Sequence, residues 1–247
     1  MPAGRIYKVK AKRSRIYRKK KKLSRREAGL IKLGRGILSA GIPDQMTHTF
    51  KYSENIQLNV GASGSPAVHV WHPNNLYDPS GITSSSTSSQ ANHQPMDYDL
   101  FLGTTTQFYN RYKVLKCYYK LTIINTSSNP VRLVLKSLPH TETPTTSSDM
   151  DAMIEQGAQY RILSGSGGTK ANTYFKGVID HKKLEGVRYL DDTSFSAVSS
   201  GPPTFQNYLA LYNQTIESAE DAPSVYCQIV LSFVTQLRDR NVNDVLN

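Results

Sequence analysis

Apolar residues alternate with polar residues along several runs of the chain beyond residue 46. In residues 48–60 (HTFKYSENIQLNV), Glu54 is the one polar interruption of an apolar set that shares a single parity: Phe50, Tyr52, Ile56, Leu58 and Val60. A period of two is the pattern of a strand with one buried face. Residues 48–60 are therefore predicted to form a one-sided strand.

Five more runs have the same character. In residues 113–124 (KVLKCYYKLTII) one parity is apolar and the other is rich in lysine: Leu115, Cys117, Tyr119, Leu121 and Ile123 against Lys116, Tyr118, Lys120 and Thr122. The same alternation predicts strands at 131–138 (VRLVLKSL), 173–179 (TYFKGVI), 207–213 (NYLALYN) and 225–237 (VYCQIVLSFVTQL). The length of the last run predicts a central strand.

The body of the chain shows one clear helix signal, at Ser148. The sequence S-D-M-D that begins there predicts a short helix over 150–156, which Gly157 ends. Long connections at 72–95 and 137–149 are typical of binding or interface surfaces. Seven or eight strands with long loops and no βαβ alternation predict an all-β sandwich or jelly roll.

Charge divides the chain into two parts. Residues 1–36 hold 15 Lys and Arg against the single acid Glu27, about +14, which leaves about −3 of the total +11 for residues 37–247. Such a density of like charge opposes folding, so the arm is expected to be disordered until a polyanion neutralises it. We therefore predict a basic arm at 1–36 and one β-domain at 37–247.

The arm places aromatic side chains among its cations, because Tyr7 and Tyr17 sit in two similar stretches, RIYK and RIYR. Cations neutralise phosphates and tyrosines stack on unpaired bases, so nucleic-acid binding is predicted. The residues predicted to bind it are Arg5, Tyr7, Lys8, Lys10, Lys12, Arg13, Arg15, Tyr17, Arg18, Lys19, Lys20, Lys21, Lys22, Arg25 and Arg26. The alternative is a basic tail that serves only in nuclear import, and both uses are compatible. The import signal would comprise Lys12, Arg13, Arg15, Arg18, Lys19, Lys20, Lys21 and Lys22.

The residue patterns of common enzymes and metal sites are missing. The stretch GSGGTK (165–170) departs from a phosphate-binding loop because Thr169 precedes the lysine, and it is read as a flexible hairpin. His69 and His72 would point to opposite faces of a strand, and the adjacent Asp191 and Asp192 are typical of solvated loop acids. We therefore predict no enzyme activity and no cofactor or metal.

The two cysteines, Cys117 and Cys227, lie in apolar, tyrosine-rich stretches. Buried free thiols in a reducing compartment are the favoured interpretation, with a disulfide as the alternative. The N-terminus has no apolar run of the secretory kind, and no stretch approaches 18 consecutive apolar residues. We expect a soluble protein with no membrane span.

Several segments carry a recognisable order of motifs. VHVWHPNNLYDPSG (68–81), HQPMDYDLF (93–101) and FYNRYKVLKCYYKLTIINTS (108–127) contain W-x-P-N-N-L-Y-D-P, Q-P-x-x-Y-D and Y-x-x-Y-K-V. Together with YFKGVIDHKKLEGV and GPPTFQNYLALY, they resemble the capsid proteins of small circular single-stranded DNA viruses, the circovirus-like group. The arm departs from that group in being rich in lysine rather than arginine.

The resemblance implies a single eight-stranded jelly roll at 37–247 that forms a shell, with the arm turned inward onto a single-stranded DNA genome. It implies a homo-oligomer, expected as 60 copies in a T=1 icosahedron, located in the virion and in the host nucleus during assembly. Host import receptors and an unidentified cell-surface receptor are the other expected partners. The alternative hypothesis is a cellular nucleic-acid-binding β-domain protein with a basic tail.

Overall fold

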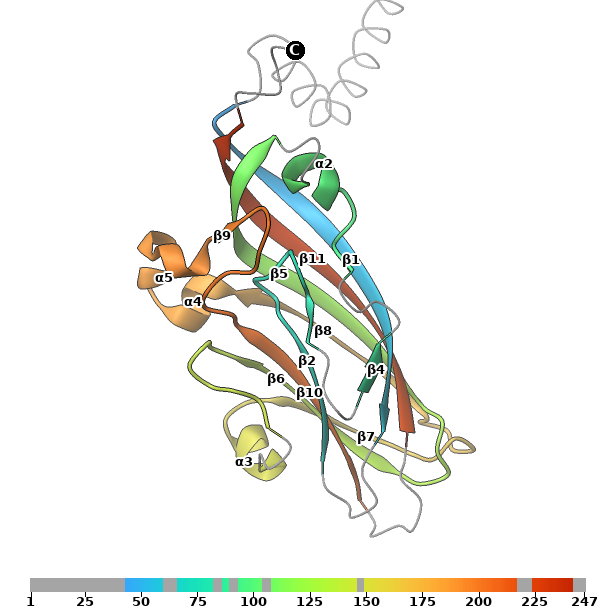
Figure 1. The fold of residues 1–247 in the computed structure, drawn as a ribbon. Coiled ribbons are helices and arrows are strands. Elements are labelled where there is room, and N and C mark those ends of the chain that lie inside the picture. Colours follow the sequence, from blue (N-terminus) through green and yellow to red (C-terminus); the bar gives the residue numbers. More distant parts are fainter. Residues whose placement is uncertain are drawn as a thin grey trace, which may run out of the picture. The chain divides into compact units, whose positions relative to one another are not determined.

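The computed structural model describes residues 43–59, 66–81, 86–88, 93–103, 108–145, 149–216 and 224–241. The strands of these residues form two antiparallel sheets (Figure 1). Sheet A has the order β4 (Ser86–Ser88), β1 (Gln45–Asn59), β11 (Ser224–Arg240), β5 (Tyr109–Asn125), β8 (Asn172–Asp180), and the short β9 (Ala197–Val198) also pairs with β5. Sheet B has the order β3 (Ser80–Gly81), β2 (Ala67–Trp71), β10 (Tyr208–Thr215), β6 (Val131–Leu138), β7 (Gln159–Leu163).

The pairing of the longer strands is nested. With the short strands β3, β4 and β9 set aside, the first strand β1 pairs with the last, β11, and the second, β2, pairs with the seventh, β10. The third, β5, pairs with the sixth, β8, and the fourth, β6, pairs with the fifth, β7. A ladder that pairs from its ends inward and folds into two sheets is a jelly roll. The predicted all-β, eight-stranded jelly roll is confirmed.

The inward faces of the two sheets form the core, and the predicted alternation places the right residues there. In β1 the predicted set is buried as far as Leu58, while Val60 lies outside the described residues. The long strand β11 lies between β1 and β5, as its length predicted.

In β5 the alternation is less regular than predicted: Leu115 is only half-buried and Val114 is fully buried. The register between β5 and β11 shifts between Val234 and Thr235, as at a β-bulge, which changes the parity of β5 there.

Both cysteines face this core as free thiols. Cys117 lies opposite Phe233, and Cys227 lies opposite Ile123. Burial raises the pKa of both thiols well above the ordinary value. The prediction of buried free thiols is therefore confirmed, and the disulfide alternative is wrong.

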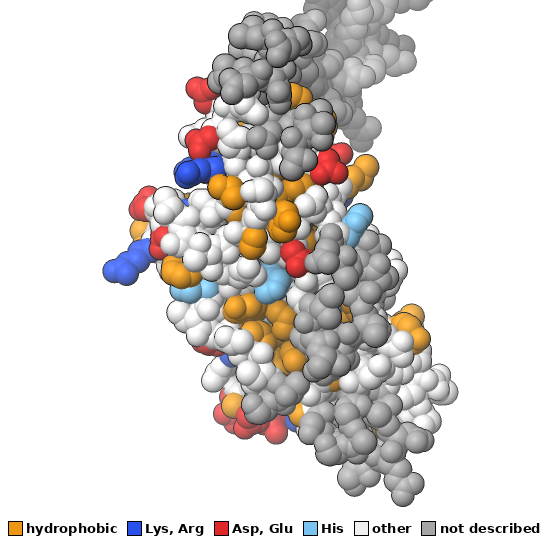
Figure 2. Space-filling view, viewed as in Figure 1, with side chains coloured by type: hydrophobic (Ala, Val, Ile, Leu, Met, Phe, Trp, Pro, Cys, Tyr) orange, Lys and Arg blue, Asp and Glu red, His pale blue; other side chains and the backbone are white. Residues whose placement is uncertain are grey.

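Part of the outward face of sheet B is covered by α3 (Met150–Glu155). Met150 and Met153 of the helix pack on Val134, Ala210 and Tyr212 in a second apolar cluster. Asp149 caps the helix by accepting hydrogen bonds from the backbone N–H groups of Asp151 and Ala152. The predicted cap, Ser148, lies outside the described residues, and the residue that caps the helix in the structure is Asp149. Figure 2 views this side of the molecule, where acidic side chains gather over α3.

Other short helices were not predicted: α2 (Tyr98–Leu102), α4 (His181–Glu185), α5 (Arg188–Asp191) and the 3₁₀ turn η1 (Thr193–Phe195). None has more than five residues, too few for a helical period to appear in the sequence. They lie in the long connections 72–108 and 181–207. None of the helices in the described part of the chain is long and apolar enough to cross a membrane.

The prediction that residues 165–170 form a hairpin is wrong. The strands on either side of them, β7 and β8, do not pair with each other: β7 pairs with β6 in sheet B, and β8 pairs with β5 in sheet A. The stretch is a connection that crosses between the two sheets. Within it, the backbone N–H of Gly168 donates a hydrogen bond of 2.8 Å to the oxygen of Gly165, which closes a tight turn. Gly165 also lies against the backbone of Ser128, where an added Cβ would meet the oxygen at 1.9 Å.

Candidate functional site

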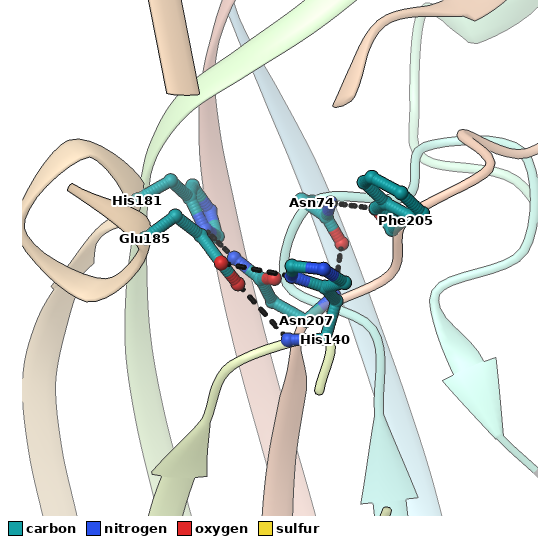
Figure 3. Close-up of polar contacts among 6 residues, drawn as sticks. All are labelled: Asn74, His140, His181, Glu185, Phe205 and Asn207. Carbon is teal, nitrogen blue, oxygen red and sulfur yellow. Dashed lines mark hydrogen bonds and ion pairs between the residues drawn. The ribbon is translucent and has the colours of Figure 1, made fainter. Parts of the chain in front are cut away.

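All of the predicted nucleic-acid-binding and nuclear-import residues of the arm lie outside the described residues, so these assignments stay predictions. The described part of the chain contains a different concentration of polar side chains. It lies where the three long connections, 72–108, 139–158 and 181–207, meet (Figure 3). We refer to Asn74, His140, His181, Glu185, Phe205 and Asn207 as the loop cluster.

Asn74 joins the first connection to the third. Its Nδ2 donates a hydrogen bond of 2.8 Å to the backbone oxygen of Phe205, and its Oδ1 accepts one of 2.9 Å from the backbone N–H of Asn207. Asn74 and Asn207 are both fully buried. One amide side chain thus satisfies two backbone groups of a loop that is more than 130 residues away in sequence, as buried backbone requires.

His181 begins α4 and is fully buried between the same two connections. Its Nε2 is 3.1 Å from the backbone oxygen of Pro73, which can only accept, so Nε2 carries the proton. Its Nδ1 then accepts a hydrogen bond of 2.9 Å from Nδ2 of Asn207. Burial lowers the pKa of His181 to about 4, against the smaller opposing effects of the Pro73 carbonyl and the Asp180 carboxylate. The imidazole is therefore neutral at pH 7.

His140 brings the second connection into the loop cluster. Its Nδ1 lies 2.8 Å from Oε2 of Glu185, and its backbone N–H donates a hydrogen bond of 2.9 Å to Oε1 of the same carboxylate. The ring stacks on Phe205 with 4.3 Å between centroids and meets Phe195 edge-on. Glu185, at the end of α4, thus fixes both the backbone and the side chain of His140.

A buried lysine anchors the helices of the third connection to sheet A. Lys113 of β5 has only 1% of its surface exposed, and its Nζ donates hydrogen bonds to the backbone oxygens of Leu190 and Asp192. The same ammonium lies 5.3 Å from the centre of the Tyr189 ring. Burial lowers the pKa of Lys113.

Glu54, the polar interruption in the apolar pattern of β1, is a second buried polar group with hydrogen-bond partners in the core. Glu54 is 2% exposed and lies in the core between the sheets. Its Oε2 accepts a hydrogen bond of 2.9 Å from Nε1 of Trp71, and its Oε1 accepts one of 2.7 Å from the Ser80 hydroxyl. The carboxylate therefore ties β1 of sheet A to β2 and β3 of sheet B.

The geometry of the loop cluster supports a structural role. Its carboxylate and imidazoles are engaged with backbone groups and with each other. The described residues contain no group of three His, Cys, Asp or Glu side chains placed to hold a metal ion. Asp192 accepts a hydrogen bond from the backbone N–H of Ser194, so it caps η1 rather than standing free in solvent as expected.

The individual roles in the loop cluster were not predicted from the sequence. The segments that contain most of its members, WHPNNLYDP, DHKKLEG and GPPTFQNY, were noticed only because they resemble capsid motifs. The structure gives these motifs a physical meaning, since their polar side chains meet in one place. Asn75, the second asparagine of the first motif, holds the following turn by accepting hydrogen bonds from the backbone N–H groups of Tyr77 and Asp78.

No family model matches the chain, and no curated protein sequence matches it. Solved structures that are similar to it include Desmodium yellow mottle tymovirus, at 14% identity and a TM-score of 0.40, covering 83% of this chain and 94% of that chain. A semi-empty virus-like particle of Macrobrachium rosenbergii nodavirus is 11% identical with a TM-score of 0.42, covering 82% and 99%. The decameric BFDV capsid protein is 11% identical with a TM-score of 0.38, covering 78% and 99%. Each TM-score is below 0.5, so the assignment of the jelly roll rests on the strand order of the chain itself.

Proposed function

We propose that this chain is the capsid protein of an icosahedral virus, which self-assembles into a shell and packages single-stranded circular DNA through its basic N-terminal arm. The observation that carries the proposal is the separation of charge along a jelly-roll chain. About +14 lies in residues 1–36, directly before the first strand of the fold, and about −3 lies in the rest. Jelly rolls also occur in lectins and other proteins, so the basic arm is what favours a capsid.

The charge of the arm suits packaging. An icosahedral shell has at least about 60 copies, which would bring about 840 positive charges to the genome. Each can offset one phosphate, so a genome of about one to two thousand nucleotides would be substantially neutralised. Lysine neutralises phosphate as a point charge, without the bidentate geometry of arginine, which suits packaging that is indifferent to sequence.

The circular single-stranded DNA and the host nucleus enter the proposal through the resemblance of the motifs. The cluster at 12–22 would direct import of the protein, and the same residues would bind the genome inside the shell. Tyr7 and Tyr17 would add a preference for unpaired bases by stacking on them, worth about 1–3 kcal/mol per base.

Electron microscopy of the purified full-length protein tests the proposal. We expect closed shells of uniform diameter that protect nucleic acid from added nuclease, and the protected material should be digested by DNase after the shells are opened. A chain without residues 1–36 should keep the emission of the buried Trp71 but lose most of its DNA binding. A protein that binds nucleic acid yet never forms shells would instead be a cellular nucleic-acid-binding β-domain protein.

A further inference from the structure

The two sheets differ in what covers their outward faces. In sheet B, α3 covers part of the outward face and leaves Tyr160 and Ile162 of β7 exposed. In sheet A, the outward positions of β1, β11, β5 and β8 remain exposed to solvent. We refer to these positions, within 51–57, 226–234, 116–124 and 172–180, as the open face. It includes six exposed apolar or aromatic side chains: Tyr118, Ile124, Tyr174, Val178, Tyr226 and Val230. A contiguous group of this size on a sheet is typical of an interaction surface.

The open face is also basic. Its outward positions hold four lysines, Lys51, Lys116, Lys120 and Lys176, and a single acid, Asp180. Asp180 is already paired with Lys116 at 3.1 Å. The net charge of the face is therefore about +3, counting each side chain at pH 7.

Two lysines of the open face, Lys120 on β5 and Lys176 on β8, repel each other unless an anion lies between them. Lys120 and Lys176 stand directly opposite each other in the β5–β8 pair. Like charges in that position destabilise a sheet, with Cβ atoms about 4.5–5.5 Å apart. The cross-strand neighbour of Lys120 on its other side is Val230, which offers no counter-charge. A bound phosphate would relieve this repulsion.

The tyrosines lie around this lysine pair. Tyr118 precedes Lys120 by two residues on β5, and Tyr174 precedes Lys176 by two residues on β8. From the strand registers and spacings, Tyr118 and Tyr174 are about 14 Å apart, and Tyr174 and Tyr226 about 12 Å apart. The three side chains are 49%, 56% and 50% exposed. The ammonium of Lys176 lies 6.0 Å from the centre of the Tyr174 ring, on one of its faces, so a base would stack on the other face of that ring. Aromatic rings spaced along a basic groove or face are the surface on which unpaired bases stack.

We propose that the open face of sheet A binds single-stranded nucleic acid, which deepens and rests on the proposed packaging function. Tyrosines of the face stack on bases, and Lys120 and Lys176 hold a phosphate between them. Only residues 37–44 separate the basic arm from Gln45, where β1 of sheet A begins, so nucleic acid held by the arm is tethered to this sheet. The arm then supplies the salt-dependent attraction, and the open face supplies stacking.

Charge argues against the other occupants of the open face. A second copy docked face to face would oppose two surfaces of about +3, and the basic arm would be repelled in the same way. Two of the acids over α3 of another copy are already engaged within their own chain, and Glu155 is the exposed acid left on that helix. Asp149 caps the helix, and Asp151 pairs with Arg132 at 2.6 Å.

Photo-cross-linking of the full-length protein tests the proposal. The probe is a random-sequence single-stranded DNA of about 30 nucleotides that carries 5-bromodeoxyuridine, and the cross-linked peptides are identified by mass spectrometry. We expect cross-links to peptides that contain Tyr118, Tyr174 or Tyr226. Binding is also measured at about 0.6 M NaCl, where the contribution of the arm has fallen steeply.

A variant with all three tyrosines changed to Ser should lose at least tenfold in affinity at this salt concentration. The matched control is Tyr160→Ser on β7 of sheet B, where the tyrosine is equally exposed at 49% and affinity should not change. Changing Lys120 and Lys176 to Ala should lower the salt dependence of binding by about one phosphate contact, whereas the same change at Lys182 and Lys183 of α4 should not. Trp71 emission checks that each variant is folded.

The outcomes separate this proposal from the function on which it rests. Cross-links confined to residues 1–36, with full affinity of the tyrosine variant, would overturn the binding role of the open face and leave packaging by the arm intact. A tyrosine variant that binds DNA normally but no longer assembles would overturn it in favour of contact between copies. A wild-type protein that neither binds the probe nor forms shells would overturn the proposed function, and this inference with it.

Discussion

Acidification should destabilise the protein through His181. The unfolded chain binds a proton at this histidine with a pKa near 6.5, and the folded chain does so only at about 4. Between these pH values the unfolded state holds more protons, so the free energy of unfolding falls as the pH falls. Above pH 6.5 the neutral imidazole costs the folded state nothing, so the free energy of unfolding keeps its full value. Well below pH 4 a pKa difference of this size has lowered that free energy by about 3 kcal/mol.

Burial is the main reason why the folded state resists the proton at His181, and the hydrogen bond from Asn207 acts in the same direction. Nδ1 accepts from Asn207, so a proton there would face a donor, unless the amide of Asn207 turned over. Oδ1 of Asn207 is buried and accepts no hydrogen bond from the described residues. Rotation of the amide would bring this oxygen to the protonated ring and would leave Nδ2 in its place without an acceptor.

Urea unfolding followed through Trp71 measures the effect, because Trp71 is the only tryptophan of the chain and is fully buried. Between about pH 7.5 and pH 5, His181 should contribute a loss of about 2 kcal/mol, or a shift of about 1 M in the urea midpoint. The variant His181→Gln should be less stable at neutral pH but should lose about 2 kcal/mol less than wild type over this range. His93→Gln, at an exposed histidine, is the control.

Two results would refute the reasoning about His181. The first is an equal pH-dependent loss in wild type and His181→Gln, which would assign the acid sensitivity elsewhere, for example to His69 and His72, whose pKa values burial lowers to about 3 and about 4. The second comes from Asn207→Asp, which places a carboxylate beside Nδ1 and should raise the pKa of His181. A larger acid-induced loss in Asn207→Asp than in wild type would contradict the proposed hydrogen-bond geometry.

Three further predictions concern the stability of the fold. Urea unfolding of purified protein measures every variant except Leu231→Asp, for which the yield of soluble protein is measured. Ser80→Ala should destabilise it by about 1–3 kcal/mol, because the buried Glu54 loses a hydrogen-bond donor, and an effect near zero would mean that another donor replaces it. Asp149→Ala should cost about 1 kcal/mol by removing the cap of α3, whereas Asp149→Asn should cost less; equal losses would argue against capping. Leu231→Asp, at a fully buried position of β11, should prevent soluble expression, and Val230→Thr, at a 38% exposed neighbour, should change stability by about 0.5 kcal/mol or less; similar effects would contradict the assigned faces.

Six of the eight longer strands could be predicted from the sequence, because their burial follows a period of two, which needs no knowledge of partners. β2 and β7 were not predicted, since β2 is buried at every position and β7 is exposed at all but its last, so neither alternates. The predicted apolar faces of β1 and β11 are the buried faces of the structure. The limits of the method appear where burial comes from elsewhere. Val134 of β6 is buried although its parity faces outward, because α3 covers it, and a distant helix leaves no mark on the local pattern of a strand.

The polar sites were harder to predict because their partners are remote in sequence. Glu54 was visible as an interruption in an apolar run, but its partners Trp71 and Ser80 are 17 and 26 residues away. His140 and Glu185 are 45 residues apart, and the local sequence of neither residue indicates that the other is its partner. The arm presents the opposite case: its charge predicts a kind of ligand directly, without any tertiary contact.

The loop cluster shows that loop positions of this chain restrict their side chains more than strand positions in the core do. A strand position in the core requires only an apolar side chain of suitable volume, so many residues satisfy it. A buried loop requires a particular donor or acceptor for each backbone group, and Asn74 meets two such requirements at once, at Phe205 and at Asn207. Substitution there leaves buried polar groups without partners, whereas substitution between apolar residues in β11 leaves the pattern unchanged. The segments WHPNNLYDP and GPPTFQNY therefore hold each other in place where the loops of the jelly roll meet, and a motif in this chain indicates a structural contact as readily as a reactive site.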